Sequence, residues 1–196
     1  MVSRVSSKLI VPAKAPLFAR LAMTHDPETL FISCSDARVV PELITQSEPG
    51  ELFVVRTAGN LVPAYAPGAA DGVAASIEYA VAILGVADIV ICGHSACGAM
   101  TALAEGHDLA AVPAVAEWLR HADAAQARAA TGATGANDVS ALVRQNVTAQ
   151  LANLATHPSV TGALTRHTLA LHGWIYDIGT GMVSQLDPLT NEFVAL

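Results

Sequence analysis

The chain is organised around the stretch GHSACGAM, which runs from Gly93 to Met100. It follows the apolar run 87–92 and precedes a segment with helical spacing, so it is expected to turn the chain from a buried strand into a helix. Its imidazole at His94 and its thiol at Cys97 are both good zinc ligands. Two ligands do not complete a site, and the best third candidate is Cys34, which also closes an apolar run.

Strands and helices are expected to alternate along most of the chain. The strand candidates are 29–33, 52–56, 88–92, 169–178 and 182–186, and the tail 188–196 offers a last edge strand. The helix candidates are 15–23, 41–45, 71–84, 96–104, 112–130, 139–156 and 159–167. This alternation predicts an α/β fold with a mostly parallel central sheet, of order about 2-1-3-4 plus a C-terminal edge strand, flanked by helices. In that order strands 1 and 3 are neighbours, so Cys34 can meet His94 and Cys97 at their carboxyl ends.

Composition limits the kind of protein this can be. The chain has 196 residues, a net charge of −7 and scattered basic residues, so we expect no nucleic-acid partner. No apolar run is long enough to span a membrane, and no secretory signal is evident, so we expect a cytoplasmic protein without membrane contact. Three cysteines without a repeating spacing argue against a disulfide framework and leave reduced thiols for a metal.

One domain is expected over residues 1–196, since no repeat or second domain is visible. Residues 1–25 are expected to form an N-terminal arm, extended over 1–13 and helical after it. The chain is 53% hydrophobic and only 14% charged, which suggests that part of its surface is covered by another subunit. The arm is a good candidate for packing on that partner.

Asp36 and Arg38 follow Cys34 closely and carry opposite charges. A carboxylate and a guanidinium at this spacing can pair through two hydrogen bonds when the loop curls. Taken alone, the same segment is more typical of an exposed turn with a weak ion pair.

Several motifs together resemble the β-class carbonic anhydrases. The sequence CSDAR at 34–38, with HSACG beginning 60 residues after Cys34, is the most specific of them. ELFVVR at 51–56, AGN at 58–60, SIEYA at 76–80 and LHGWIYD at 171–177 also fit the family. The resemblance covers nearly the whole chain.

The resemblance implies reversible hydration of carbon dioxide to bicarbonate and a proton, by hydroxide on one zinc ion per chain. Cys34, His94 and Cys97 match the family's zinc ligands, and Asp36 and Arg38 match its catalytic pair. It also implies a homodimer or a dimer of dimers with active sites at the subunit interface. Three further positions match residues that contact substrate, namely Phe53, Tyr79 and His25, where many members carry glutamine.

Phe31 is a departure from the family pattern. Members with a non-catalytic bicarbonate pocket carry tryptophan there, and phenylalanine lacks the indole N–H. In the family's closed form the aspartate matching Asp36 leaves its arginine and becomes the fourth zinc ligand. We therefore expect no such pocket here, and an open site near neutral pH.

Two other functions remain compatible with the sequence. The same fold and zinc could hydrolyse a related linear molecule such as carbon disulfide, or the zinc could be structural, with its fourth position closed. The intact Asp36–Arg38 pair disfavours the structural alternative, because a structural site does not need it. A zinc deaminase is excluded, because its H-x-E and P-C-x-x-C motifs are absent.

Overall fold

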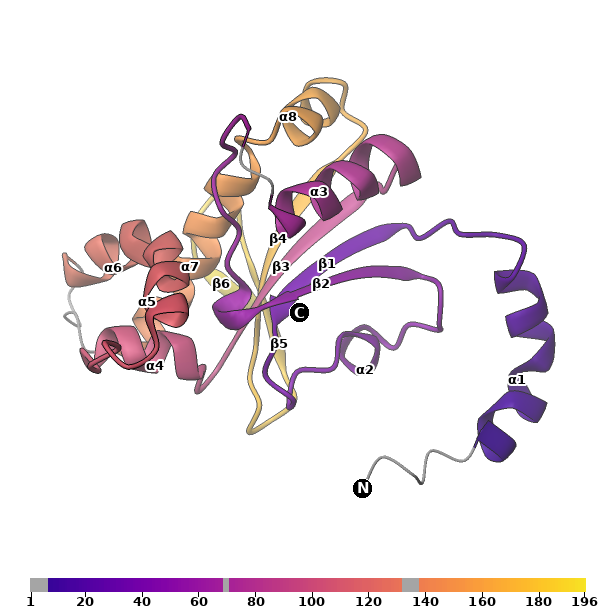
Figure 1. Cartoon of the computed structure of the whole chain (residues 1–196), viewed down its shortest axis with the longest axis horizontal. Helices are drawn as coiled ribbons and strands as arrows, with labels where there is room; N and C mark the ends of the chain where they lie inside the picture. Colours follow the sequence, from indigo (N-terminus) through magenta and orange to yellow (C-terminus); the bar gives the residue numbers. More distant parts are fainter. Residues whose placement is uncertain (1–6, 69–70, 132–137) are drawn as a thin grey trace.

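The computed structural model describes residues 7–68, 71–131 and 138–196, and its centre is a six-stranded sheet. The strands are β1 (Thr29–Cys34), β2 (Leu52–Thr57), β3 (Asp88–His94), β4 (Ala170–Tyr176), β5 (Val183–Leu186) and β6 (Phe193–Ala195). Their order is β2-β1-β3-β4-β5-β6 (Figure 1). The first four strands are parallel, and β5 and β6 are added antiparallel. The predicted order 2-1-3-4 and the edge strand are confirmed.

Helices lie on both sides of the sheet, unequally. They are α1 (Ser7–Leu21), α2 (Pro41–Thr45), α3 (Gly72–Glu78), α4 (Gly98–Ala104), α5 (Pro113–Leu119), α6 (Asp123–Ala130), α7 (Val139–Leu154) and α8 (Pro158–Thr165). Figure 1 shows α3, α7 and α8 together on one side and α2 on the other. Helix α1 stands apart from the sheet, and an ion pair between Lys14 and Glu48 joins it to the loop before β2.

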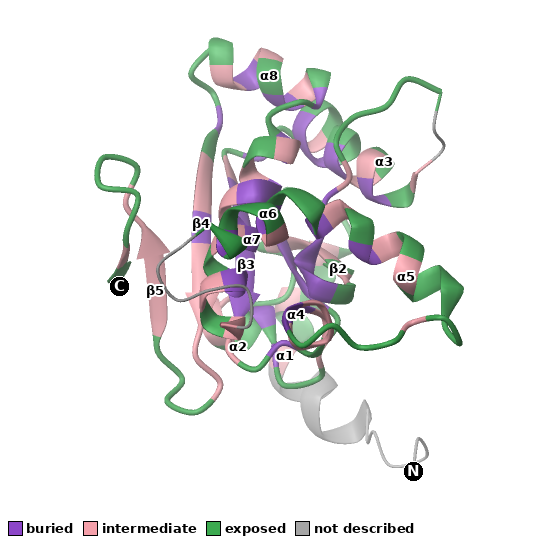
Figure 2. Cartoon of the chain, turned by 90° about the vertical axis from the view of Figure 1, so that its left-hand side faces the viewer, coloured by how far each residue is buried: buried purple, intermediate pink, exposed green. Residues whose placement is uncertain are grey.

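The two faces of the sheet carry different cores, because successive side chains of a strand point to opposite faces. Leu30, Ile32, Ile89 and Ile91 belong to the main core, which also includes apolar residues of α3, α7 and α8. The alternate residues of β1 and β3 form a smaller cluster on the opposite face, around Phe31. Burial on both faces explains why the central strands read as continuous apolar runs. In Figure 2 the buried residues gather along β3, whereas β5 is only partly buried.

Two strand glycines let helix α7 lie close to the sheet. A Cβ placed on Gly93 would lie 2.8 Å from Val147 of α7, and one on Gly173 would lie 2.9 Å from the same side chain. Gly93 was expected to begin the turn, but it lies within β3, which continues to His94. The residue is therefore needed for close packing of helix on strand, and the turn follows His94.

Other predicted boundaries were wrong. Residues 7–13 are helical rather than extended. A proline inside a helix removes one hydrogen bond and crowds the preceding turn, which destabilises the helix without excluding it, so Pro12 was a weaker signal than expected. Residues 1–6 of the expected arm lie outside the described part. The helix expected at 71–84 is α-helical to Glu78 and a π-helix over Tyr79–Leu84. The helix expected at 112–130 is divided by a 3-10 turn at Arg120–Ala122.

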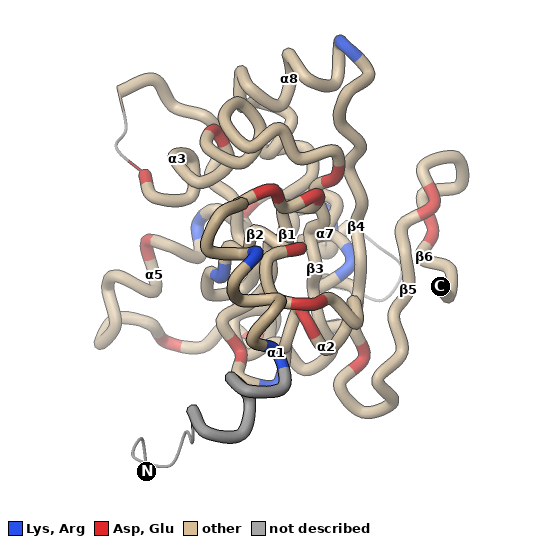
Figure 3. The backbone as a smooth tube through the Cα atoms, turned by 90° about the vertical axis from the view of Figure 1, so that its right-hand side faces the viewer, with Lys and Arg blue, Asp and Glu red and all other residues tan. Residues whose placement is uncertain are grey.

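Charged residues are spread over the chain. Figure 3 shows Lys and Arg at separate places along the backbone rather than in one stripe. Within the residues that the structure describes, no helix combines the length and the apolar character needed to cross a bilayer.

Candidate metal centre

Cys34, His94 and Cys97 meet at the carboxyl edge of the sheet. Cys34 is the last residue of β1, His94 is the last residue of β3, and Cys97 directly precedes α4. Their ligand atoms all lie within 4.8 Å of one another, and all three side chains are buried. Adjacent parallel strands thus bring together donors that are 60 residues apart in the sequence.

The imidazole of His94 is oriented to offer one nitrogen. Its Nδ1 lies 2.9 Å from the carbonyl oxygen of Ser95, and this bond places the proton on Nδ1. Nε2 is fully buried and has no hydrogen-bond partner among the described residues. A buried, unpaired acceptor is costly unless something binds it. An orphaned imidazole nitrogen beside two thiols is the donor set that zinc prefers, so these residues fit that metal.

The two ligand thiols interact with each other. The sulfur atoms of Cys34 and Cys97 lie within 4.8 Å of each other, and their interaction lowers the pKa of Cys34 and raises that of Cys97. The backbone N–H of Gly59 also donates to Cys34 Sγ, at 3.4 Å. Cys34 is therefore prepared to carry negative charge, the form in which a thiol binds a metal.

Asp36 and Arg38 form a two-pronged ion pair beside the three donors. Arg38 Nε donates to Asp36 Oδ1 at 2.9 Å, and Nη2 donates to Oδ2 at 2.6 Å. These bonds hold the pKa of Asp36 well below its usual range. Asp36 Oδ2 lies 4.0 Å from the free nitrogen of His94, so the carboxylate is adjacent to the donors while bound to Arg38.

The sequence did not single out Arg56 as a support for this loop. From β2, its Nε donates to the carbonyl oxygen of Cys34 at 3.0 Å, and its Nη2 donates to that of Asp36 at 2.5 Å. The guanidinium thereby fixes the backbone that carries both a ligand and the carboxylate. A charged residue at the end of an otherwise apolar strand was the available signal.

The residues expected to contact substrate lie together, but away from this chain's own donors. The rings of His25 and Phe53 are 6.2 Å apart, and those of Phe53 and Tyr79 are 5.9 Å apart. In the register of the sheet Phe53 pairs with Leu30, four residues before Cys34. Four residues of strand span about 13 Å. Within one chain, this aromatic cluster cannot line the space beside the donors.

Phe31 is fully buried against Trp174, with the rings edge to face at 6.0 Å. It packs in the smaller core, together with Cys92. Phe31 is thus a packing residue in this structure, and the expectation about a bicarbonate pocket remains a prediction.

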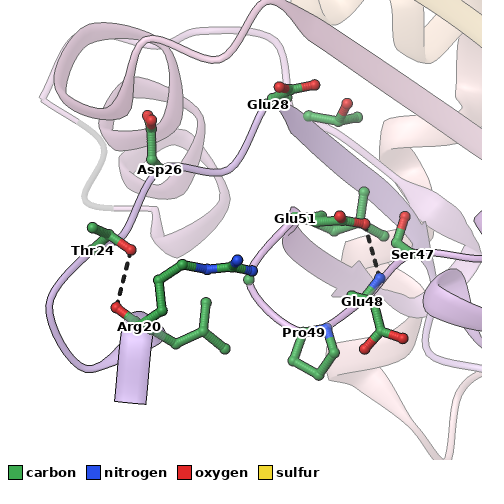
Figure 4. Close-up of a pocket in the computed structure, with 12 residues that line it drawn as sticks. Arg20, Thr24, Asp26, Glu28, Ser47, Glu48, Pro49 and Glu51 are labelled. Carbon is green, nitrogen blue, oxygen red and sulfur yellow. Dashed lines mark hydrogen bonds between the residues drawn. The ribbon is translucent and has the colours of Figure 1, made fainter. Parts of the chain in front are cut away.

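A hollow of about 360 Å³ lies by the beginnings of β1 and β2, at the opposite end of these strands from Cys34 (Figure 4). Arg20 enters it from α1, beside the carboxylates of Asp26, Glu28, Glu48 and Glu51. An excess of acidic groups does not favour an anion such as bicarbonate. Over the described ranges, the one set of His, Cys, Asp or Glu atoms that converges as metal ligands is Cys34, His94 and Cys97.

Comparison with known proteins agrees with this geometry. A family model described as carbonic anhydrase matches residues 29–183. The carbonic anhydrase of Pseudomonas aeruginosa is 58% identical over 187 residues, which is 94% of this chain and 84% of the relative.

Solved structures give the same result. The β-carbonic anhydrase CcaA matches with a TM-score of 0.90 and 41% identity, over 95% of this chain and 85% of the other. A tetrameric β-carbonic anhydrase from Sordaria macrospora matches with a TM-score of 0.77 and 32% identity, over 90% of this chain and 88% of that one. The family model spans most of the chain, the relatives span nearly all of it, and a Cys-His-Cys zinc site stands where the sheet ends, so the chain belongs to the β-class carbonic anhydrases.

Proposed function

We propose that the chain hydrates carbon dioxide reversibly to bicarbonate and a proton, with Cys34, His94 and Cys97 holding one zinc ion and Asp36 and Arg38 serving the reaction. The observation that carries the proposal is the unpaired Nε2 of His94, buried between two thiols and 4.0 Å from an Arg-bound carboxylate. Three protein ligands leave a fourth position for the reaction, which is the pattern of a catalytic zinc site.

Zinc supplies the nucleophile, because it lowers the pKa of a bound water toward neutrality. The carboxylate of Asp36 would accept a hydrogen bond from a hydroxyl group at the open position and so orient it toward the substrate. Only the ionised carboxylate can do this, and the lowered pKa of Asp36 supports its ionisation throughout the working range of pH.

Arg38 has two roles in this proposal. Its two N–H groups fix the plane of the Asp36 carboxylate, as a bidentate guanidinium does. A third bond, from Nη2 to the carbonyl oxygen of Ala96 at 3.1 Å, ties the pair to the turn that carries Cys97. The carboxylate and the ligand turn therefore keep their relative positions.

A second copy of the chain is proposed to complete the site. Phe53 lies about 13 Å along the sheet from its own chain's Cys34, and the rings of His25 and Tyr79 lie beside that of Phe53, so the cluster is proposed to line a slot for another subunit's zinc. Tyr79 is 44% exposed and available for such a contact. We propose a homodimer or a dimer of dimers, in which the arm at 1–25 packs on the partner. The solved relative described as tetrameric supports this.

The chain is proposed to work as one domain over 1–196, in the cytoplasm. The ligand thiols have to stay reduced to bind metal, and reducing compartments keep them so.

Stopped-flow hydration of carbon dioxide, on protein with measured zinc content, tests the proposal. The matched variant is Asp36→Asn, which keeps the shape of the side chain and removes its charge. We expect turnover at pH 7.5 in the wild type and a loss of about 100-fold or more in the variant, at unchanged zinc content.

Two results would contradict the proposal. Equal turnover of wild type and Asp36→Asn would remove Asp36 from the reaction. Zinc at one ion per chain without carbon dioxide turnover at any pH would favour the structural alternative, or carbon disulfide as the substrate, which is assayed on the same samples.

A further inference from the structure

One peptide group connects the proposed metal centre to a residue outside it. The peptide between Ala58 and Gly59 points its N–H at Cys34 Sγ, with N to S at 3.4 Å. The carbonyl oxygen of the same peptide accepts a hydrogen bond from Nε1 of Trp118, at 2.9 Å. Trp118 lies on α5, 60 residues further along the chain. The indole N–H, the peptide and the sulfur therefore form one line of hydrogen bonds.

The next peptide group, between Gly59 and Asn60, is bound by a side chain of helix α7. Asn146 of α7 donates from Nδ2 to the carbonyl oxygen of Gly59 at 2.9 Å. Gln150, one turn later, donates to Asn146 Oδ1 at 2.9 Å and so fixes which way the Asn146 amide faces. Both side chains are buried. Asn146 thus sets the position of Gly59, while Trp118 binds the peptide that faces the sulfur.

Gly59 could not easily be replaced by another residue. Its φ is +75°, and a Cβ there would lie 3.0 Å from Ala99 and 3.2 Å from Met100. Glycine restricts the backbone little, so the Ala58–Gly59 peptide could rotate if nothing bound its carbonyl oxygen. The hydrogen bond from Trp118 therefore fixes the orientation of this peptide.

We propose that Trp118 is a positioning residue for the zinc thiolate of Cys34. It acts through the Ala58–Gly59 peptide, whose carbonyl it binds and whose N–H it thereby aims at the sulfur. The inference rests on the ligation of zinc by Cys34 proposed above. Hydrogen bonds in a chain polarise one another, so a donor on the carbonyl strengthens the N–H on the other side of the peptide. A hydrogen bond to a ligand atom in turn tunes the metal that this atom holds.

The test compares two tryptophan variants. Trp118→Phe removes the indole N–H and keeps an aromatic ring beside His121, whose ring lies 5.1 Å from that of Trp118. Trp174→Phe is the matched control, because it also removes one indole donor, which in this case binds Gln185 at 3.2 Å. Two properties are measured for each protein: zinc affinity by competition with a chromogenic chelator, and the thiolate-to-metal charge-transfer band after loading with cobalt(II).

Trp118→Phe is expected to weaken zinc binding by about 3- to 10-fold and to move the charge-transfer band to longer wavelength. The shift follows because a thiolate that loses hydrogen bonding holds its electrons less tightly. Trp174→Phe is expected to keep the wild-type affinity and band. Unchanged values in Trp118→Phe, or equal changes in both variants, would overturn the inference. Absence of any thiolate band in cobalt-loaded wild type would instead mean that the proposed ligation is wrong.

A measurement on the wild type covers the case in which Trp118→Phe does not fold. Protein labelled with ¹⁵N-glycine and loaded with ¹¹³Cd should show scalar coupling between the metal and the Gly59 amide proton, carried through the sulfur of Cys34. Selective ¹⁵N-labelling of the indole should show the Trp118 Nε1 proton protected from exchange. Loss of either signal would overturn the inference.

Discussion

The three cysteines differ sharply in what surrounds their sulfur atoms. Cys34 and Cys97 face each other beside His94, and a bound metal would cover both. Cys92 lies in the smaller core with no exposed surface, and burial raises its pKa to about 12. A thiol in that state is neutral and inaccessible at physiological pH.

Removal of the metal should therefore make the thiol of Cys34 reactive before the other two. With zinc bound, iodoacetamide at pH 8 is expected to label none of the cysteines of the native protein. After zinc is removed with a chelator, Cys34, whose pKa is lowered, is expected to react well before Cys97, whose pKa is raised, and Cys92 is expected to react only in denaturant. Mass spectrometry of the digested protein identifies the labelled positions, and zinc added back before labelling is the control. Labelling of Cys92 in the native metal-free protein would show that the smaller core opens.

At this scale the sequence revealed the donors but not their supports. Cys34, His94, Cys97 and the Asp36–Arg38 pair could be predicted because their chemistry is local and their spacing specific. Arg56 and Trp118 act by binding carbonyl oxygens of distant segments. Every residue has a backbone carbonyl group, so the sequence does not indicate which one a side chain will bind.

Among the elements, α7 is packed against the sheet most tightly at Gly93 and Gly173. Gly93→Ala should destabilise the protein by about 1–3 kcal/mol, because its methyl group would overlap Val147. Gly72→Ala, at the start of α3, is the matched control, since a Cβ there meets no atom within 4 Å. We expect the control to change stability by less than about 0.5 kcal/mol. Urea unfolding of zinc-free proteins at one protein concentration measures both, and equal values would refute the close-packing argument.

The turn between β4 and β5 provides a dependence on pH. The backbone N–H and the hydroxyl of Thr180 both donate to Asp177 and lower its pKa below the ordinary 3.8. A lowered pKa means that the ionised carboxylate stabilises the folded state above the ordinary value, and that this contribution is lost as pH falls through the folded pKa. Asp177→Asn should therefore melt below wild type at pH 7, and the two melting temperatures should converge below pH 3.8. A gap of constant size across this range would contradict the prediction.

Helix positions were predicted more successfully than helix types. Asp71 caps α3 by accepting a hydrogen bond from the N–H of Val73, and Gly85 ends the helical segment with φ +70°. The change to a π-helix at Tyr79 was not predictable, because the residues have the same apolar spacing in either form. The break at Arg120–Ala122 likewise falls within an alanine-rich run that carries no breaker.

In the whole molecule, each aromatic cluster is proposed to serve the zinc of another subunit, which mixing can test. Cys34→Ser is expected to lose zinc, and Tyr79→Arg to place a charge in the apolar slot. Each variant alone should have little activity. If the chains exchange, a mixed pair contains one site with an intact zinc set and an intact Tyr79, so activity should return to a substantial fraction of wild type.

Lack of recovery, once subunit exchange is shown with differently tagged chains, would place substrate contacts within one chain. Mixing either variant with itself is the control.

The sequence predicted the strand order well, because alternation of strands and helices restricts the topology. It gave no account of how far Phe53 lies from its own Cys34, which only the register of the sheet reveals.

The position of the zinc ligands on β1 and β3 also has a consequence for how the chain folds. The two strands are joined through β2, α3 and the π-helix, so Cys34 and His94 approach each other only after that whole intervening segment has been arranged. Pairing over such a separation is slow compared with local helix formation. Metal binding during refolding therefore reports when the central sheet has formed. The visible absorption of bound cobalt(II) should develop after most of the helical circular dichroism signal has returned.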